Sequence, residues 1–131
     1  MGLAALGTAL SNNRSIKYLN LAQNGFRDSG MKVFVQYLNN PDCALQELSL
    51  MGNKINNEGI RTLSEFIKVN KSLQMLDLGR NMFGDAGFKF FAQEMGAVCK
   101  LTYLDLSKNK DLSDEGSLII LAQQLTHNKF L

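Results

Sequence analysis

The chain has 131 residues, of which 45% are apolar and 20% charged, as expected for one ordered globular domain. Its 14 basic residues nearly balance its 12 acidic ones and form no run of like charge, so we expect neither nucleic acid nor a membrane surface as a partner. The longest apolar run, residues 118–122, is far shorter than the roughly 20 residues of a membrane-spanning helix, and the first residues do not resemble a secretory signal, so we expect a cytoplasmic protein.

The chain begins with a segment that predicts a helix and a turn. Leu3, Leu6 and Leu10 lie three and four residues apart, the spacing of one face of an α-helix. Residues 11–15 are polar and turn-forming. We interpret residues 1–15 as part of a repeating unit, because complete copies of such a unit follow.

One motif of nine residues recurs four times along the chain. It reads Leu-x-x-Leu-x-Leu-x-x-Asn, with Ile16 in place of the first leucine in the first copy. The copies start at residues 16, 45, 73 and 101, which are 29, 28 and 28 residues apart. This recurrence predicts a single domain built of repeats. We divide it into a partial repeat 1–15, repeats 16–44, 45–72, 73–100 and 101–130, and the start of a further repeat at 131.

The middle of each motif predicts a β-strand, spanning Lys17 to Leu21 in the first copy. Because side chains alternate along a strand, Leu76 and Leu78 of the third copy point one way, while Met75 and Asp77 point the other way. One unit cannot bury its leucines alone, but stacked units bury them in one continuous core.

A polar ladder is predicted at the end of the motif. The four asparagines are expected to stack and to bond backbone groups left unpaired where each strand turns. This structural ladder consists of Asn24, Asn53, Asn81 and Asn109.

Each motif is followed by a segment with the 0, 3, 4, 7 spacing of one helical face. The four predicted faces are Met31, Phe34, Val35 and Leu38; Ile60, Leu63, Ser64 and Ile67; Phe88, Phe91, Ala92 and Met95; and Leu118, Leu121, Ala122 and Leu125. Gly30, Gly59 and Gly87 stand directly before the first three faces, and we interpret them as close-packed entries into the helices. Pro41 predicts that the first of these helices ends just before it.

The fourth unit departs from the pattern. Leu112 follows Asn109 by three residues, whereas the equivalent apolar residues of the other units follow their asparagines by two. This unit also holds a second extra residue before its helix, which predicts a bulged loop at Lys110 to Ser117. We favour simple tolerance of a surface insertion over a functional loop.

The two cysteines occupy equivalent corners two repeats apart. Neighbouring strands lie about 4.8 Å apart, which places Cys43 and Cys99 at least about 10 Å from each other. That separation exceeds the reach of a disulfide, so we expect free thiols.

The motif, followed by an apolar residue, a glycine and a helix in units of 28 or 29 residues, resembles the leucine-rich repeat family, specifically its ribonuclease-inhibitor-like class. The resemblance covers essentially the whole chain. It implies an α/β solenoid, a right-handed segment of a horseshoe with a parallel sheet on the concave side and helices on the convex side, used as a protein-binding scaffold. Neither end shows a polar capping repeat, so we expect a window of a longer array that can self-associate end to end.

Function is then expected on the outward-facing positions of the strands. Tyrosine and methionine there are residue types enriched at protein interfaces, which favours a protein partner of unknown identity. The candidate partner-binding residues on the concave face are Tyr18, Asn20, Glu47, Ser49, Met51, Met75, Asp77, Arg80, Tyr103, Asp105 and Lys108.

Two alternative functions remain open. One is a GTPase-activating or regulatory leucine-rich repeat protein, in which Arg80 is the residue to consider. The other is an architectural array of a cytoskeletal or ciliary assembly, or the ligand-sensing part of a receptor.

Catalysis and metal binding are not favoured. Asp77 and Asp105 are predicted neighbours about 5 Å apart, and paired carboxylates can act as acid and base or hold a cation. However, no histidine accompanies them, since the only one, His127, lies in a polar segment at a helix end. We therefore predict no catalytic residue, no metal site and no cofactor.

Overall fold

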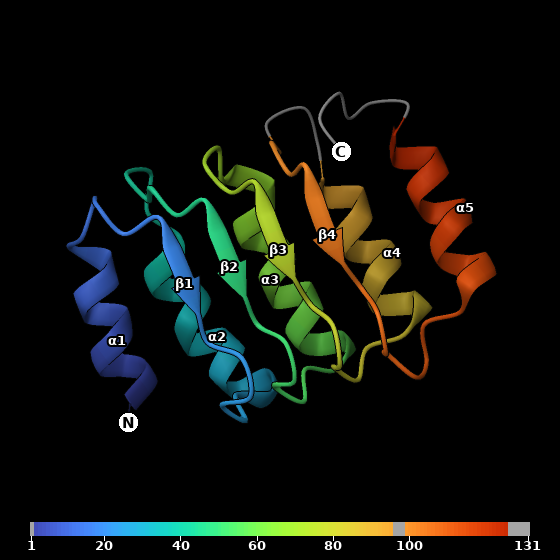
Figure 1. The fold of residues 1–131 in the computed structure, drawn as a ribbon, viewed down its shortest axis with the longest axis horizontal. Helices are drawn as coiled ribbons and strands as arrows, with labels where there is room; N and C mark the ends of the chain where they lie inside the picture. Colours follow the sequence, from blue (N-terminus) through green and yellow to red (C-terminus); the bar gives the residue numbers. More distant parts are fainter. Residues whose placement is uncertain (1, 96–98, 126–131) are drawn as a thin grey trace.

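The computed structural model describes residues 2–95 and 99–125, which form one sheet covered on one face by helices (Figure 1). The four strands are β1 (Tyr18–Asn20), β2 (Glu47–Ser49), β3 (Met75–Asp77) and β4 (Tyr103–Asp105). The five helices are α1 (Gly2–Ser11), α2 (Arg27–Leu38), α3 (Asn57–Val69), α4 (Asp85–Glu94) and α5 (Asp114–Leu125). This architecture confirms the predicted α/β solenoid with a parallel sheet.

The strands pair in parallel and in chain order, β1-β2-β3-β4. Leu19, Leu48 and Leu76 are partners across the first three strands, and Leu104 continues the row. Each strand has only three residues, so the predicted strand Lys17 to Leu21 was too long at both ends. The backbone pairing nevertheless continues past the strand, because the Leu21 N–H donates to the Ser49 carbonyl at 2.9 Å.

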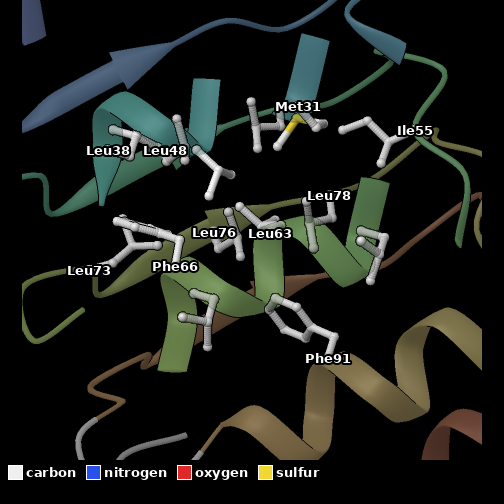
Figure 2. Packing of buried hydrophobic residues seen from close by; sticks show 14 of the residues in the cluster. Met31, Leu38, Leu48, Ile55, Leu63, Phe66, Leu73, Leu76, Leu78 and Phe91 are labelled. Atoms are coloured by element: carbon white, nitrogen blue, oxygen red, sulfur yellow. The ribbon is translucent and has the colours of Figure 1, made fainter. Parts of the chain in front are cut away.

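The leucines of the motif and the apolar faces of the helices form one core (Figure 2). Leu76 and Leu78 are fully buried, as predicted, and belong to the same cluster as Leu63 of α3. The predicted faces of α2, α3 and α4 are buried, with Met95 lying just beyond the end of α4.

The prediction for the last helix was wrong at one position. Ala122 is exposed, because α5 packs against α4 alone among the described helices. Leu121 is partly buried against the core. The side chains of Leu118 and Leu125 lie outside the described set, as do residues 126–131 with His127.

The asparagine ladder is confirmed. Asn81 Oδ1 accepts hydrogen bonds from the N–H groups of Asn53 and Ile55 in the preceding unit, at 2.9 and 3.1 Å. Its Nδ2 donates back to the Leu50 carbonyl of that unit at 3.1 Å. Asn24 in the first unit is exposed, whereas the other three asparagines are buried. Asn109 Oδ1 has no hydrogen-bond partner among the described residues, so the ladder is incomplete at its last step.

The prediction that three glycines stand at the entries of their helices was wrong. Gly30, Gly59 and Gly87 do not precede their helices but lie inside the first turn of each. The apolar spacing misplaced these starts because each helix begins with polar residues, which that spacing does not register.

A second ladder explains those polar first turns. Each unit has an Asp or Asn two residues before its glycine. In the first three units its side chain caps the next helix: Asp28 Oδ1 accepts from the Asn56 N–H at 2.8 Å, and Asn57 Oδ1 accepts from the Gly84 N–H at 2.8 Å. Asp85 continues the series, with its carboxylate accepting from the Ser113 N–H at 2.9 Å. These contacts satisfy helix-end N–H groups that have no partner within their own helix.

The glycines make room for this capping. A Cβ at residue 59 would collide with the Asp28 carboxylate, and one at residue 87 would lie 2.5 Å from Asn57 Oδ1. The glycine is therefore required by the neighbouring unit and not by its own backbone angles.

The loop of the fourth unit is shorter than predicted. Residues 110–113 form it, and α5 begins at Asp114, so the expected bulge through Ser117 was wrong at its C-terminal end. The Leu112 N–H donates to the Asn109 carbonyl at 3.1 Å, which closes a tight turn over the inserted residue.

Cys43 and Cys99 are both free cysteines. Cys43 is partly exposed, whereas Cys99 is buried. Burial raises the pKa of the Cys99 thiol, and a backbone hydrogen bond at Leu101 opposes this rise in part.

Candidate functional site

The side of the sheet that faces away from the helices is open, and Figure 1 shows it in front of the helix layer. We call this surface the open face. The pairing register aligns its residues in two columns. The first column is Tyr18, Glu47, Met75 and Tyr103, and the second is Asn20, Ser49, Asp77 and Asp105.

A groove of about 420 Å³ lies on the open face. Its lining consists of Tyr18, Leu19, Asn20, Glu47, Leu48, Ser49, Met75, Asp77 and Tyr103. Three large side chains at the groove are well exposed: Tyr18 at 65%, Met75 at 37% and Tyr103 at 49%. The alternation of strand residues explains this exposure, since the leucines between them turn inward to the core.

The carboxylates of β3 and β4 are neighbours on this face. Asp77 and Asp105 are register partners. Asp77 Oδ2 accepts a hydrogen bond from Ser49 Oγ at 3.1 Å and Asp77 Oδ1 one from the Gly79 N–H at 3.0 Å, while Asp105 Oδ1 accepts from the Ser107 N–H at 2.8 Å. These bonds fix the orientation of both carboxylates.

The ion pairs of the described residues all lie away from the open face. They are Arg14 with Asp42, Lys32 with Glu58, and Lys68 with Glu94. Within the same residues, Glu47, Asp77 and Asp105 have no cation within salt-bridge distance. The open face therefore presents negative charge that the rest of the described chain leaves unpaired.

Comparison with protein families decides what kind of repeat this is. A family model described as leucine-rich repeat matches residues 12–35, 43–64, 69–92 and 99–116. The chain belongs to the leucine-rich repeat family. The four matches each include one strand, so they coincide with the units seen in the structure.

Relatives of this leucine-rich repeat chain are found among much larger proteins. It is 37% identical over 103 residues to human NACHT, LRR and PYD domains-containing protein 13, which covers 79% of this chain and 10% of that protein. It is 33% identical over 127 residues to rat NACHT, LRR and PYD domains-containing protein 3, covering 96% of this chain and 12% of that protein. The chain thus spans about a tenth of the length of these relatives.

Solved structures share the fold at low sequence identity. The tropomodulin C-terminal domain of Caenorhabditis elegans superposes with a TM-score of 0.82 at 13% identity, over 100% of this chain and 80% of that one. Leiomodin-1 actin-binding site 2 gives 0.79 at 15% identity, over 99% and 74%. These similarities concern the fold alone.

The remaining predicted positions of the leucine-rich repeat surface lie at the rim of the groove. Met51, Arg80, Asp105 and Lys108 are not among its lining residues. Arg80 and Lys108 adopt left-handed backbone angles, with φ of 55° and 57°, at a position where the second unit has Gly52 at 69°. Neither cation forms an ion pair with Asp77 or Asp105 in the described chain.

Sequence reasoning did not single out the role of Gly79. It lies between the aspartates and the rim, and the position of its missing Cβ is 3.2 Å from Asp77 Oδ1 and 3.5 Å from Asp105 Oδ1. A side chain at residue 79 would therefore crowd an oxygen of each carboxylate. The available signal was a glycine in a column where the other units carry Ala22, Met51 and Ser107.

A second groove was also missed. It has a volume of about 580 Å³ and lies where the loops after α2 and α3 return to the sheet. Its lining includes Leu38, Pro41, Cys43, Phe66, Lys68, Val69 and Lys71. The sequence signal for this irregularity was the length of the first unit, 16–44, which is one residue longer than the second, 45–72.

Residues 2–95 and 99–125 bring no three His, Cys, Asp or Glu side chains together in a metal-binding arrangement. They also contain no helix with the length and apolar character needed to cross a membrane.

Proposed function

We propose that this leucine-rich repeat chain binds a partner protein through the open face of its sheet and acts without a catalytic step or a cofactor. The observation that carries the proposal is the groove on that face with Tyr18, Met75 and Tyr103 exposed around it. Tyrosine and methionine are enriched at interfaces, and tyrosine is also enriched among the residues that dominate binding energy. A sheet face left uncovered by helices gives a partner direct access to them.

The proposed contact surface consists of the groove and its rim. It comprises Tyr18, Asn20, Glu47, Ser49, Met51, Met75, Asp77, Arg80, Tyr103, Asp105 and Lys108. The rigid strands hold these side chains at fixed spacing, which lowers the entropy lost when a partner binds.

Two finer assignments accompany the proposal. The period of 28 or 29 residues, with a helix of 10 to 13 residues in each unit, supports the ribonuclease-inhibitor-like class of repeat. The free thiols of Cys43 and Cys99 favour a reducing compartment, and we infer the cytoplasm.

A regulatory role within a larger protein is the second candidate. The observation in its favour is the similarity to proteins whose names combine NACHT, LRR and PYD domains, of which this chain spans about a tenth. In that setting the open face would bind either a separate protein or another domain of the same one.

Selection from a phage-displayed library of random twelve-residue peptides tests the proposed function. We expect selected peptides to bind the chain and to lose at least about tenfold in affinity when Met75 and Tyr103 are both replaced by alanine. Fluorescence anisotropy measures the affinity, and circular dichroism checks that the fold is unchanged.

The matched control is a double alanine variant on the helix layer. Lys32 and Lys89 are exposed there, and their replacement should leave peptide affinity unchanged. If the control variant loses binding while the Met75 and Tyr103 variant retains it, the interface is on the helices and the proposed function is wrong in its location.

A further inference from the structure

We propose that the open-face groove is specific for an extended segment of a partner protein that carries arginine or lysine, with the cationic group placed against Asp77 and Asp105 and beside Tyr103. This inference rests on the proposed function and adds the chemistry of the partner. It is built on three observations: the unpaired carboxylates, their fixed orientation beside Gly79, and the exposed ring of Tyr103 on the strand that carries Asp105.

The carboxylates are ionic groups without a counterion. Asp77 and Asp105 are partly buried, and in the described chain no Lys, Arg or His side chain lies within salt-bridge distance of either. Glu47 adds a third carboxylate, and it lines the groove together with Asp77. An incoming cation can form charge-assisted hydrogen bonds with these carboxylates.

The two carboxylates also lie next to a glycine. A Cβ at residue 79 would lie 3.2 Å from Asp77 Oδ1, 3.5 Å from Asp105 Oδ1 and 3.2 Å from Ser107 Oγ, so the glycine leaves the space beside both carboxylates free of a side chain. One oxygen of each carboxylate is held by a main-chain N–H. The arrangement is therefore formed before a ligand arrives.

The aromatic ring selects an organic cation. Tyr103 precedes Asp105 by two residues on β4, so both side chains leave the same face about 6.6 Å apart along the strand. A guanidinium or ammonium group between them gains a cation–π contact as well as an ion pair. A divalent metal ion gains nothing from the ring, and Ca²⁺ needs six to eight oxygen ligands.

The partner segment is extended because the groove runs across the strands. Tyr18 and Tyr103 belong to the first and fourth strands, so they are about 14 Å apart at a strand spacing of about 4.8 Å. An extended segment covers that distance with four to five residues at about 3.3 Å each. Tyr18 and Met75 then provide apolar contacts beside the cation site.

The attraction is local and not a property of the whole chain. The formal net charge is +2, so a basic peptide is not drawn to the protein by its overall charge. Binding of such a peptide must therefore arise from a particular cluster of carboxylates, which site-directed variants can identify.

The test uses three labelled twelve-residue peptides, in which threonine alternates with arginine, with citrulline or with glutamate. Citrulline keeps the shape of arginine without its charge. We expect the arginine peptide to bind about tenfold more tightly than the citrulline peptide and the glutamate peptide to bind least. The double variant D77N/D105N should abolish the preference for arginine, and its amide oxygens can still accept the Gly79 and Ser107 N–H bonds.

The control is E58Q/E65Q, which removes the same charge from the exposed side of α3 and should leave the preference for arginine unchanged. Equal binding of the arginine and citrulline peptides, with both weakened by the Met75 and Tyr103 alanine variant, overturns this inference and leaves the proposed function standing. Peptide binding that survives that alanine variant overturns both. NMR shifts of Asp77 and Asp105 with Ca²⁺, and none with the arginine peptide, identify a metal site and also overturn the inference.

Discussion

The two faces of the sheet are built from alternate residues of the same short strands, yet they differ in how closely the units agree. The inward row is leucine in every strand, Leu19, Leu48, Leu76 and Leu104, whereas the outward register row is Tyr18, Glu47, Met75 and Tyr103. Inward residues must fit the units on either side, so stacking demands the same residue each time. Outward residues meet no such demand and can differ, which is why the open face can carry specific chemistry.

The largest expected effect comes from adjacent residues on opposite faces. Leu76 is fully buried, and Leu76→Ala should lower the free energy of unfolding by about 2–5 kcal/mol. Met75→Ala, next to it on the open face, should cost less than about 1 kcal/mol because 37% of Met75 is exposed. Urea denaturation measures both, and equal losses would contradict the assignment of the two faces.

The next effect compares the buried and exposed ends of the asparagine ladder. Asn81→Ala removes the acceptor of the Asn53 and Ile55 N–H groups and the donor to the Leu50 carbonyl, all buried. Leaving such groups unpaired should cost about 2–4 kcal/mol. Asn24→Ala at the exposed position should cost about 1 kcal/mol or less, because water replaces the lost bonds. Thermal unfolding followed by circular dichroism compares the two, and a larger loss for Asn24 would disprove the ladder.

A smaller effect separates two helical glycines that differ in their neighbours. At Gly87 a Cβ would lie 2.9 Å from the Asn57 Cα as well as on its amide oxygen, so Gly87→Ala should destabilise by about 1–3 kcal/mol. At Gly30 the nearest atom is the end of the Leu3 side chain, which can move, and the gain in helix propensity of about 1 kcal/mol offsets the contact. Urea midpoints should therefore fall for Gly87→Ala and stay nearly unchanged for Gly30→Ala.

The smallest effect is expected at the rim of the open face. Arg80 has a φ of 55°, a left-handed angle that disfavours a side chain, so Arg80→Gly should raise stability by up to about 1 kcal/mol. The converse change Gly52→Ala, at a φ of 69°, should lower stability by a similar amount. Differential scanning calorimetry resolves both, and a loss of stability in Arg80→Gly would show that its side chain makes a stabilising contact.

The buried residues were predictable from the sequence because four units repeat the same spacing of apolar residues. The spacing of Leu76, Leu78 and Asn81 recurs at a fixed period, and period two within the strand determines which residues are buried. The columns of the open face followed from the same register. Their role in binding stays a prediction, since nothing in the repeat pattern constrains them.

What could not be predicted depends on contacts between units. The helices begin at polar residues such as Asn57 and Asp85 because their side chains cap the helix of the next unit. The spacing of apolar residues carries no information about that contact. The motif Asp/Asn-x-Gly is visible in the sequence at 28–30, 57–59, 85–87 and 114–116. Only the structure shows that the Asp or Asn of one unit lies against the glycine of the next unit. Likewise, the space beside Asp77 and Asp105 depends on the missing side chain of Gly79.

The two ladders run in opposite directions along the chain. The ladder residues Asn53, Asn81 and Asn109 bond to the unit before them, whereas the capping residues Asp28, Asn57 and Asp85 bond to the unit after them. The first, second and third units are thus joined at both junctions by hydrogen bonds of both ladders. Removing residues 45–72 as one block would bring Asn24 against Asn81 and Asp28 against the start of α4. Both the ladder hydrogen bond and the capping hydrogen bond would then re-form. Such a chain can therefore gain or lose one whole unit without losing its fold. A partial deletion breaks the ladder and capping hydrogen bonds at once.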